Sequence, residues 1–222
     1  VLVSAVIWFV ISWLFLPDHK TVPLAQRVPQ LEIMASLVKM PAVQVVLVMS
    51  VGVFLFNHGL NNWLVELLRI GGMTVETAGY WATLPTVVGI FGSLIIPRLA
   101  TQKRRFAILI FLCGLALVAS ILLRLSDGFP LAAGLILQGI ARSSMMTVLI
   151  LTLVELPGIG ESRTGVASGM FFSAAEIGGV LGPLGIGLLY DASGGFGSSL
   201  TALSCVASLL MLGAVILRRA AR

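Results

Sequence analysis

Charged residues are scarce in this sequence of 222 residues. Asp, Glu, Lys and Arg together make up 10% of it, whereas hydrophobic residues make up 58% and the mean hydropathy is +1.07. Soluble globular domains carry about 25% charged residues, so the composition excludes that class. The apolar runs are continuous and of helix length, and a bilayer core requires each span to satisfy its own backbone polar groups. The sequence therefore predicts an all-α, polytopic membrane protein.

Cysteine and histidine are also rare, with two residues of each. Cys113 and Cys205 stand alone inside apolar segments, without the spacing of metal ligands. No nucleophile with a base and no phosphate-binding glycine loop accompanies them. The sequence thus predicts no metal, no cofactor and no enzyme activity. The net charge of +5 comes mostly from short connections between apolar segments, which membrane topology explains without a nucleic-acid partner.

Six apolar segments are long enough to cross a bilayer, which takes about 20 residues per helix. An earlier apolar segment, residues 1–16, has neither the basic region nor the cleavage site of a signal peptide and is expected to be the end of a truncated transmembrane helix. Prolines and cations break residues 17–40, which are expected to form a cytoplasmic linker. A six-helix transmembrane bundle is predicted over residues 41–217, with a basic cytoplasmic tail over residues 218–222. The six spans begin at Pro41, Ala78, Phe106, Pro130, Thr164 and Gly197.

Four apolar residues of the linker share one helical face. This face predicts a short helix that lies on the membrane surface, and a solvated connector is the alternative. The four residues are Leu31, Met34, Ala35 and Val38.

Lysine and arginine are distributed unevenly among the connections. One side of the predicted membrane holds only Arg69 and Arg124, and the other side holds eleven basic residues. Because basic residues accumulate on the cytoplasmic side, the linker and the C-terminus are expected in the cytoplasm of a multi-pass plasma-membrane protein. The eleven residues are Lys20, Arg27, Lys39, Arg98, Lys103, Arg104, Arg105, Arg163, Arg218, Arg219 and Arg222.

Three small or helix-breaking residues recur 86 positions apart. By the charge distribution, the span at Pro41 enters from the cytoplasm and the span at Pro130 enters from outside. The recurrence therefore predicts two inverted three-helix repeats, an arrangement typical of secondary transporters. The recurring residues are Gly79, Gly92 and Pro97, followed by Gly165, Gly178 and Pro183.

Two ionisable residues, Arg142 and Glu176, lie near the centres of their spans. A charge at this depth costs about 2.5 to 3.5 kcal/mol on insertion scales, so the two are expected either to pair or to face water and a substrate. Glu176 is the candidate for proton coupling, because a carboxyl group at mid-depth can exchange its proton as its surroundings change. His58 is a second candidate for a proton relay, with a structural, hydrogen-bonded histidine as the alternative.

Polar residues at helical spacing accompany Arg142. Gln138 lies four residues before Arg142, so the two share a face. A guanidinium group can bind a carboxylate or phosphate at two points, and amides can orient the remainder of a ligand. The alternative is that the amides join helices through hydrogen bonds. The predicted substrate-binding residues are Arg142, Gln138, Asn57, Asn61 and Asn62.

Gly178 and Gly182 form a pair of small residues one helical turn apart, followed directly by Pro183. Small residues at this spacing let two membrane helices approach closely. The three residues are therefore predicted to serve helix packing.

Several stretches together resemble the C-terminal half of a major facilitator superfamily transporter, over essentially the whole chain. They are Glu161-Ser-Arg-Thr-Gly, Gly178-Gly-Val-Leu-Gly-Pro183 up to Asp191, the segment from Gly92 to Arg105, and the linker before Pro41. The resemblance implies the end of helix 6, the central loop, and helices 7 to 12 of that family. It also implies a missing N-terminal half of six helices as a partner. The acidic residue that the family often carries after the glycine corresponding to Gly92 is absent, which weakens the inference of a cytoplasmic gating ion pair at that position.

The resemblance further implies that the spans at Pro41 and Pro130 line a central cavity. The leading hypothesis is a secondary transporter half that moves a small, plausibly anionic solute by alternating access within membrane lipid. The alternative is a non-transporting membrane sensor or assembly subunit of the same fold. In that alternative, Arg142 and Glu176 form a structural ion pair.

Overall fold

The structure is a computed structural model that describes residues 6, 8–12, 29–125 and 127–221. The described residues are overwhelmingly helical and contain no strand, which confirms the all-α class. Most of the predicted truncated helix and the first part of the predicted linker lie outside them. Six of the described helices are long and apolar enough to cross a membrane. The helices are α2 (Gln30–Val38), α3 (Pro41–Ile70), α4 (Val75–Leu99), α5 (Arg105–Leu122), α6 (Gly128–Val154), α7 (Gly160–Ser193) and α8 (Phe196–Ala220).

Local chemistry explains where several of these helices begin and end. Pro41 occupies the first turn of α3, where its missing N–H has no intrahelical partner to lose. Thr74 caps α4, because its side-chain oxygen accepts a hydrogen bond of 3.3 Å from the Thr77 backbone N–H. Gly194 ends α7 with a φ of 69°, a conformation that favours glycine. Each span begins within four residues of its predicted start.

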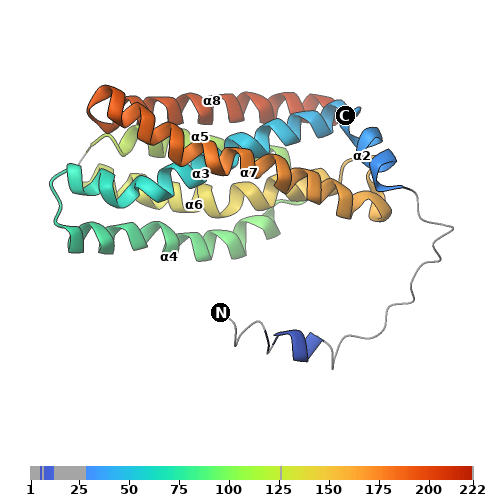
Figure 1. Cartoon of the computed structure of the whole chain (residues 1–222), viewed down its shortest axis with the longest axis horizontal. Coiled ribbons are helices and arrows are strands. Elements are labelled where there is room, and N and C mark those ends of the chain that lie inside the picture. The colour runs from blue at the N-terminus through green and yellow to red at the C-terminus, as the bar shows by residue number, and fades with distance from the viewer. Residues whose placement is uncertain (1–5, 7, 13–28, 126, 222) are drawn as a thin grey trace.

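The six spans run side by side as one bundle (Figure 1). The helices α3 and α6 begin at opposite ends of it, so the units α3–α5 and α6–α8 have opposite orientations. The two most extensive helix contacts join α3 to α7 and α4 to α6. In the two units α3 corresponds to α6, and α4 corresponds to α7. The contact of α3 with α7 is therefore equivalent to the contact of α6 with α4. The contacts therefore follow the inverted three-helix repeats predicted from the sequence.

The contact between α3 and α7 is made by backbone against backbone. A Cβ atom added at Gly178 would lie 2.8 Å from the Val51 carbonyl carbon, closer than real Cβ atoms approach other atoms. One turn further, a Cβ atom at Gly182 would lie 2.9 Å from the backbone nitrogen of Gly59. The contact between α4 and α6 is similar, because a Cβ atom at Gly139 would lie 2.8 Å from the Cα atom of Pro85. Both equivalent contacts, α3 with α7 and α4 with α6, thus depend on glycines, which have no side chain to separate the two backbones.

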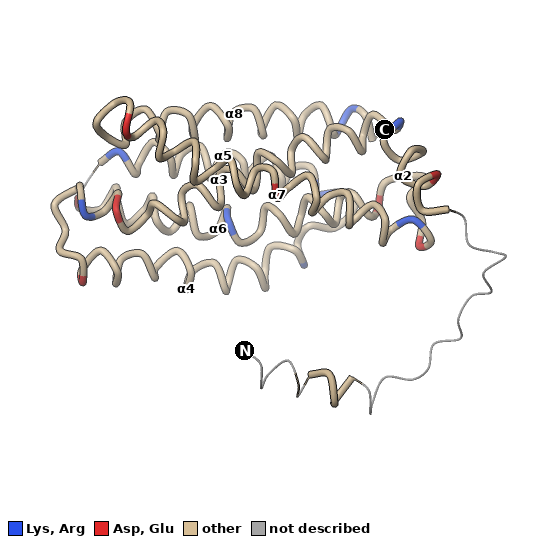
Figure 2. The backbone as a smooth tube through the Cα atoms, viewed as in Figure 1, with Lys and Arg blue, Asp and Glu red and all other residues tan. Residues whose placement is uncertain are grey.

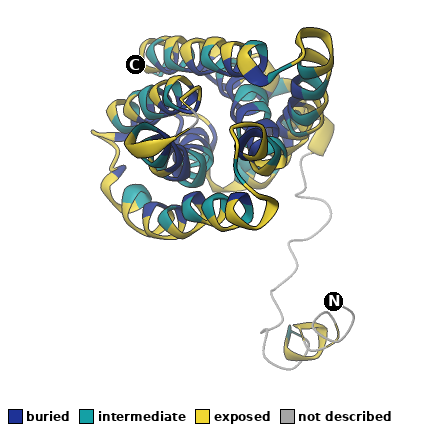
Figure 3. Cartoon of the chain, turned by 90° about the vertical axis from the view of Figure 1, so that its left-hand side faces the viewer, coloured by how far each residue is buried: buried dark blue, intermediate teal, exposed yellow. Residues whose placement is uncertain are grey.

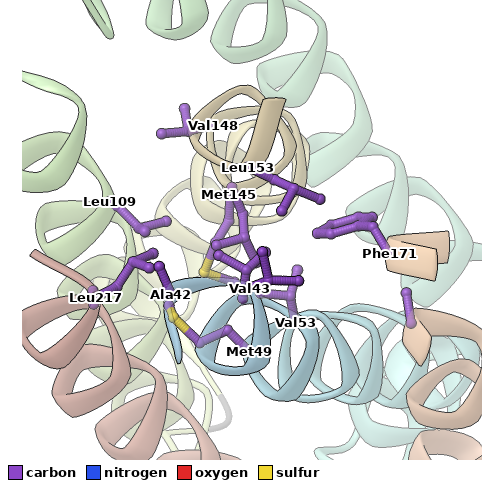
Figure 4. Packing of buried hydrophobic residues seen from close by; sticks show 14 of the residues in the cluster. Ala42, Val43, Met49, Val53, Leu109, Met145, Val148, Leu153, Phe171 and Leu217 are labelled. Carbon is purple, nitrogen blue, oxygen red and sulfur yellow. The ribbon is translucent and has the colours of Figure 1, made fainter. Parts of the chain in front are cut away.

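Buried residues line the inside of the bundle, and exposed residues cover its outer faces (Figure 3). The larger buried cluster draws side chains from six helices, and Figure 4 shows part of it. Among the spans, α3 and α6 are the most buried, and α4 and α7 are the least. The central positions of α3 and α6 place their polar residues where a ligand site can form. Labelled members of the cluster include Val43, Leu109, Met145, Phe171 and Leu217.

The short helix predicted in the linker is present as α2 (Gln30–Val38). Leu37 is fully buried, and Ile33 packs against the main buried cluster. Leu31, Met34 and Val38, which were predicted to share the membrane-facing side, stay exposed. The helix α2 packs on α7 and α3, and this tertiary contact selects its buried face.

Basic residues gather at the end of the bundle where α2 and the end of α8 lie (Figure 2). The turn between α4 and α5 is at this end, and so are the starts of α3 and α7. The basic residues that the sequence assigned to one side of the membrane therefore lie at one end of the bundle, as far as the structure describes them. This end is called the basic end below.

Candidate functional site

Arg142 lies near the middle of α6 and connects three helices. Its guanidinium group donates one hydrogen bond to Asn61 Oδ1 on α3 and another, of 3.3 Å, to Thr86 Oγ1 on α4. The Asn57 amide, also on α3, donates to the backbone carbonyl of Arg142 at 3.4 Å. Both side-chain partners of the guanidinium are neutral oxygens, so its positive charge is hydrogen-bonded but not neutralised.

An open pocket of about 210 Å³ surrounds this arginine. Its lining residues are Asn57, His58, Asn61 and Arg142, and all four were singled out from the sequence as candidate site residues. The structure brings them together because α3 and α6 pack against each other and present these side chains at the same level. The arrangement offers a cation, amides and an imidazole to one small solute.

Two amide side chains, Asn57 in the pocket lining and Gln138 outside it, have buried polar atoms without partners among the described residues. Gln138 is fully buried, and neither its Nε2 nor its Oε1 atom has a hydrogen-bond partner among the described residues. The Oδ1 atom of Asn57 is in the same situation. An unpaired buried polar group costs about 1–3 kcal/mol, so such groups are usually satisfied by water or a ligand. Both amides lie on the helices that form the pocket.

Asn62, like Gln138, was predicted to bind the substrate and does not line this pocket. Its side-chain nitrogen donates to the backbone carbonyl of His58 on its own helix at 2.8 Å, and the residue is exposed. The four-residue spacing of His58 and Asn62 thus produces a contact within α3.

Glu176 on α7 and His58 on α3 both lie close to Gly179. A point at the ideal Cβ position of Gly179 is 3.2 Å from Glu176 Oε2 and 3.9 Å from His58 Cδ2, so these two atoms are at most 7.1 Å apart. The His58 ring stacks on Phe54, with ring centroids 5.2 Å apart. Both candidates for proton coupling therefore lie in one neighbourhood, on the α7 side of α3.

The ion pair between Arg142 and Glu176 that the alternative hypothesis required is absent from the structure. Among the described residues the ion pairs are Glu66 with Arg69 and Arg105 with Glu155. Similar depth along two helices does not fix the direction in which each side chain points. In the structure Arg142 donates to side chains of α3 and α4, whereas Glu176 lies close to Gly179 of its own helix.

The predicted packing residues of α7 all face α3. Gly178 and Gly182 lie where the two backbones meet. The backbone carbonyl of Pro183 accepts a hydrogen bond of 2.9 Å from the indole nitrogen of Trp63. At the other end of the same contact, the Ser50 hydroxyl donates to the Phe171 carbonyl at 3.3 Å. Side chains of α3 thus hold backbone carbonyls of α7 on both sides of the glycine contact.

Two features of the site region were missed in the sequence. Thr86 follows Pro85 in a plain apolar span, and nothing in its spacing links it to Arg142. The second is the ion pair between Arg105 and Glu155, which measures 2.5 Å at the basic end. The Arg105 side chain is only 5% exposed, and the sequence analysis did not predict its pairing with Glu155. The available signal was Glu155 itself, an acidic residue in a connection on the basic side.

Comparison with known proteins identifies relatives over most of the chain. Residues 1–183 match the profile of the Major Facilitator Superfamily. The Quinolone resistance transporter of Acinetobacter baumannii is 30% identical over 165 residues, which are 67% of this chain and 35% of that protein.

Two further relatives carry less specific names. An uncharacterized protein of Archaeoglobus fulgidus is 30% identical over 146 residues, or 59% of this chain and 60% of that protein. The uncharacterized transporter YycB of Bacillus subtilis is 28% identical over 179 residues, or 77% of this chain and 42% of that protein. The chain thus spans between about a third and three fifths of the length of these relatives.

The family match covers well over half of the chain and includes α3, α4, α5 and α6 with the whole pocket around Arg142. Together with six apolar helices in a bundle, it confirms the resemblance drawn from the sequence. This multi-pass membrane protein belongs to the major facilitator superfamily.

Proposed function

We propose that this chain is the C-terminal half of a secondary transporter, and that Arg142 binds an anionic group of its solute. The observation that carries the proposal is the charge of Arg142. The guanidinium group opens onto a pocket near the middle of the bundle, and its hydrogen-bond partners among the described residues are neutral. A charge at bilayer depth is costly unless it is compensated, and an anionic solute supplies that compensation.

Alternating access is the proposed mechanism of transport. Family membership supports it, as do the transporter names of two relatives. Because the chain spans only part of those relatives, the other half of the cavity is proposed to come from an N-terminal bundle of six helices. The solute would then bind between the two halves, which expose the pocket to one side of the membrane at a time.

The membrane orientation is proposed from the basic end. Positive charge concentrates there (Figure 2), and basic residues accumulate on the cytoplasmic side of membrane proteins. The protein is therefore proposed to lie in the plasma membrane with its C-terminus in the cytoplasm.

Glu176 and His58 are proposed to couple transport to protons. Glu176 is exposed, and its Oε2 atom lies at most 7.1 Å from Cδ2 of the His58 ring. A carboxyl group and an imidazole group can each take up and release a proton. The sensor or subunit hypothesis stays as the alternative, without the ion pair between Arg142 and Glu176.

The first solute to test is a fluoroquinolone, because one relative is named a Quinolone resistance transporter. Quinolones carry a carboxylate, which a guanidinium group can hold at two points. Ligand binding to the whole purified protein is measured for ciprofloxacin and for its methyl ester, which lacks the anionic charge. A panel of small carboxylates and phosphates is tested in the same way.

The decisive variant is Arg142→Lys, which keeps the charge and loses the planar fork. Loss of one charge-assisted hydrogen bond, at about 1.5–3 kcal/mol, weakens anion binding roughly 10-fold to 100-fold. The matched control is Arg124→Lys. Arg124 is exposed and donates to Thr201 near the end of the bundle that lies opposite the basic end. Anion affinity that falls equally in both variants, or in neither, contradicts the assignment of Arg142.

A further inference from the structure

An apolar groove lies on the outside of the bundle between α3 and α8, and it is separate from the pocket around Arg142. Its volume is about 600 Å³, and its walls include Val48 from α3 and Leu209, Leu212 and Ile216 from α8. Gln44 is the polar residue of its lining. Val48 is 73% exposed and Leu212 is 55% exposed, so the walls are open to the surroundings of the bundle.

Two glycines give the groove its depth. The Leu210 side chain reaches within 2.9 Å of the point where a Cβ atom of Gly52 would stand. The Met49 side chain likewise reaches within 2.9 Å of the corresponding point at Gly213. Met49 and Leu210 are each 3% exposed, so they fill the space between the helices and form the floor of the groove. The surface above this floor stays hollow because Gly52 and Gly213 have no side chains that could fill it.

The length of the groove matches one leaflet of a membrane. From Gln44 to Gly52 the α3 axis advances about 12 Å, at 1.5 Å per residue. The hydrocarbon layer of one leaflet is roughly 15 Å thick, half of a bilayer core. A solute dissolved in water gains few hydrogen bonds in such a groove, whereas an acyl chain fits its apolar walls.

The groove opens at the basic end of the bundle. Arg219 lies three residues beyond Ile216, so it continues the helical face that lines the groove, and Arg218 adjoins it. Both arginines are exposed and form no ion pair with another described residue. Lys39 stands just before α3 at the same end (Figures 1 and 2). The apolar groove thus has about the length of one leaflet, and basic side chains lie at its open end.

We propose that this groove binds one anionic phospholipid of the leaflet at the basic end. One acyl chain lies between Val48 and Leu212, and the phosphate group meets Arg218 and Arg219. The amide of Gln44 stands between the two regions, where the glycerol backbone of the lipid lies. Its nitrogen donates one hydrogen bond to the Val38 carbonyl, which leaves its second N–H to donate to an ester carbonyl oxygen of the lipid. This site is independent of the transported solute.

The test measures lipid binding to the whole protein by native mass spectrometry after delipidation. The probes are phosphatidylglycerol and phosphatidylcholine with identical acyl chains. Phosphatidylglycerol is expected to bind more tightly by roughly fivefold for each basic residue engaged, since one such residue near a membrane surface contributes about a factor of that size. The double variant Arg218→Ala with Arg219→Ala is expected to remove most of this preference.

Filling the groove provides a second, independent arm. Val48→Trp is expected to remove one tightly bound phosphatidylglycerol, because the indole occupies the space of the acyl chain. The matched control is Val118→Trp on α5, which is also exposed, at 45%, but lies outside the groove. A photoreactive acyl chain is expected to label α3 and α8 around Val48 and Leu212 in the wild-type protein.

Five results would overturn the proposal. The first four are equal binding of the two lipids to the wild-type protein, an unchanged lipid preference in the double arginine variant, full lipid retention in Val48→Trp, and displacement of the lipid by inorganic phosphate alone. A photoreactive residue at Leu212 that links to protein instead of lipid would also overturn it, because another polypeptide segment would then cover the groove.

Discussion

The backbone contact between α3 and α7 makes a sharp prediction for a single added methyl group at Gly178. A Cβ atom there would lie 2.8 Å from the Val51 carbonyl carbon and still closer to its oxygen. Ordinary contacts of a Cβ atom begin at 3.4 Å, so Gly178→Ala forces α3 and α7 apart by about 0.6 Å or more. Separations of this size forfeit a quarter to a half of the dispersion energy of each contact that opens.

The expected cost follows from two opposing effects. Overpacking of a tight interface costs about 1–3 kcal/mol of stability, and replacing glycine by alanine within a helix returns up to about 1 kcal/mol. Gly178→Ala is therefore expected to lower the free energy of unfolding by about 1–2 kcal/mol. Gly185→Ala on the same helix serves as the matched control, because nothing lies within 4 Å of its added Cβ atom. That control is expected to be neutral or slightly stabilising.

The assay is reversible unfolding of the purified protein by a denaturing detergent in mixed micelles, followed by helix content. The two alanine variants are expected to differ by about 1–3 kcal/mol, since the propensity effect is common to both and only Gly178 adds a clash. Equal stability of the two variants would refute the reasoning, because it would mean that the backbones of α3 and α7 do not meet at Gly178.

Three further predictions concern charge and topology. Glu176→Gln is expected to abolish the pH dependence of solute uptake while exchange persists, and an unchanged pH profile of uptake would exclude the coupling role. Glu155→Ala is expected to cost about 2 kcal/mol of unfolding free energy, between the values for exposed and buried ion pairs, because it leaves Arg105 buried and unpaired. A double-mutant cycle that finds no coupling between the two residues would remove that explanation. In a background without native cysteines, a cysteine at Lys103 is expected to be shielded from an impermeant thiol reagent in intact cells and one at Asp127 to react, and equal labelling would contradict the orientation.

The positions of the spans were predictable because they depend on local properties of the sequence. The length of an apolar run and the residues at its ends decide where a membrane helix begins and stops. The predicted start at Pro41 agrees with the structure. The span predicted at Thr164 begins earlier, at Gly160, because the polar turn before it continues as helix.

The site was predictable only in part, because contacts between helices depend on how each helix is rotated about its axis. The pocket around Arg142 gathers Asn57 and Asn61 from α3, as their shared helical face suggested. Thr86 joins the arginine from α4, and no spacing within one span could show that. The pairing of Arg142 with Glu176 failed for the same reason, since equal depth leaves the rotation of α6 and α7 undetermined.

The pattern of helix contacts also determines the order in which the bundle can assemble during synthesis. Each span satisfies its own backbone in the bilayer and can insert alone. The first unit nevertheless has few contacts of its own, because α4 packs mainly on α6, α5 packs on α6 and α8, and α3 packs mainly on α7. After the ribosome has delivered α3, α4 and α5, these helices must wait in the membrane for partners made later. Tertiary structure therefore forms late, and a nascent chain that stops before α6 leaves three inserted helices open to quality control.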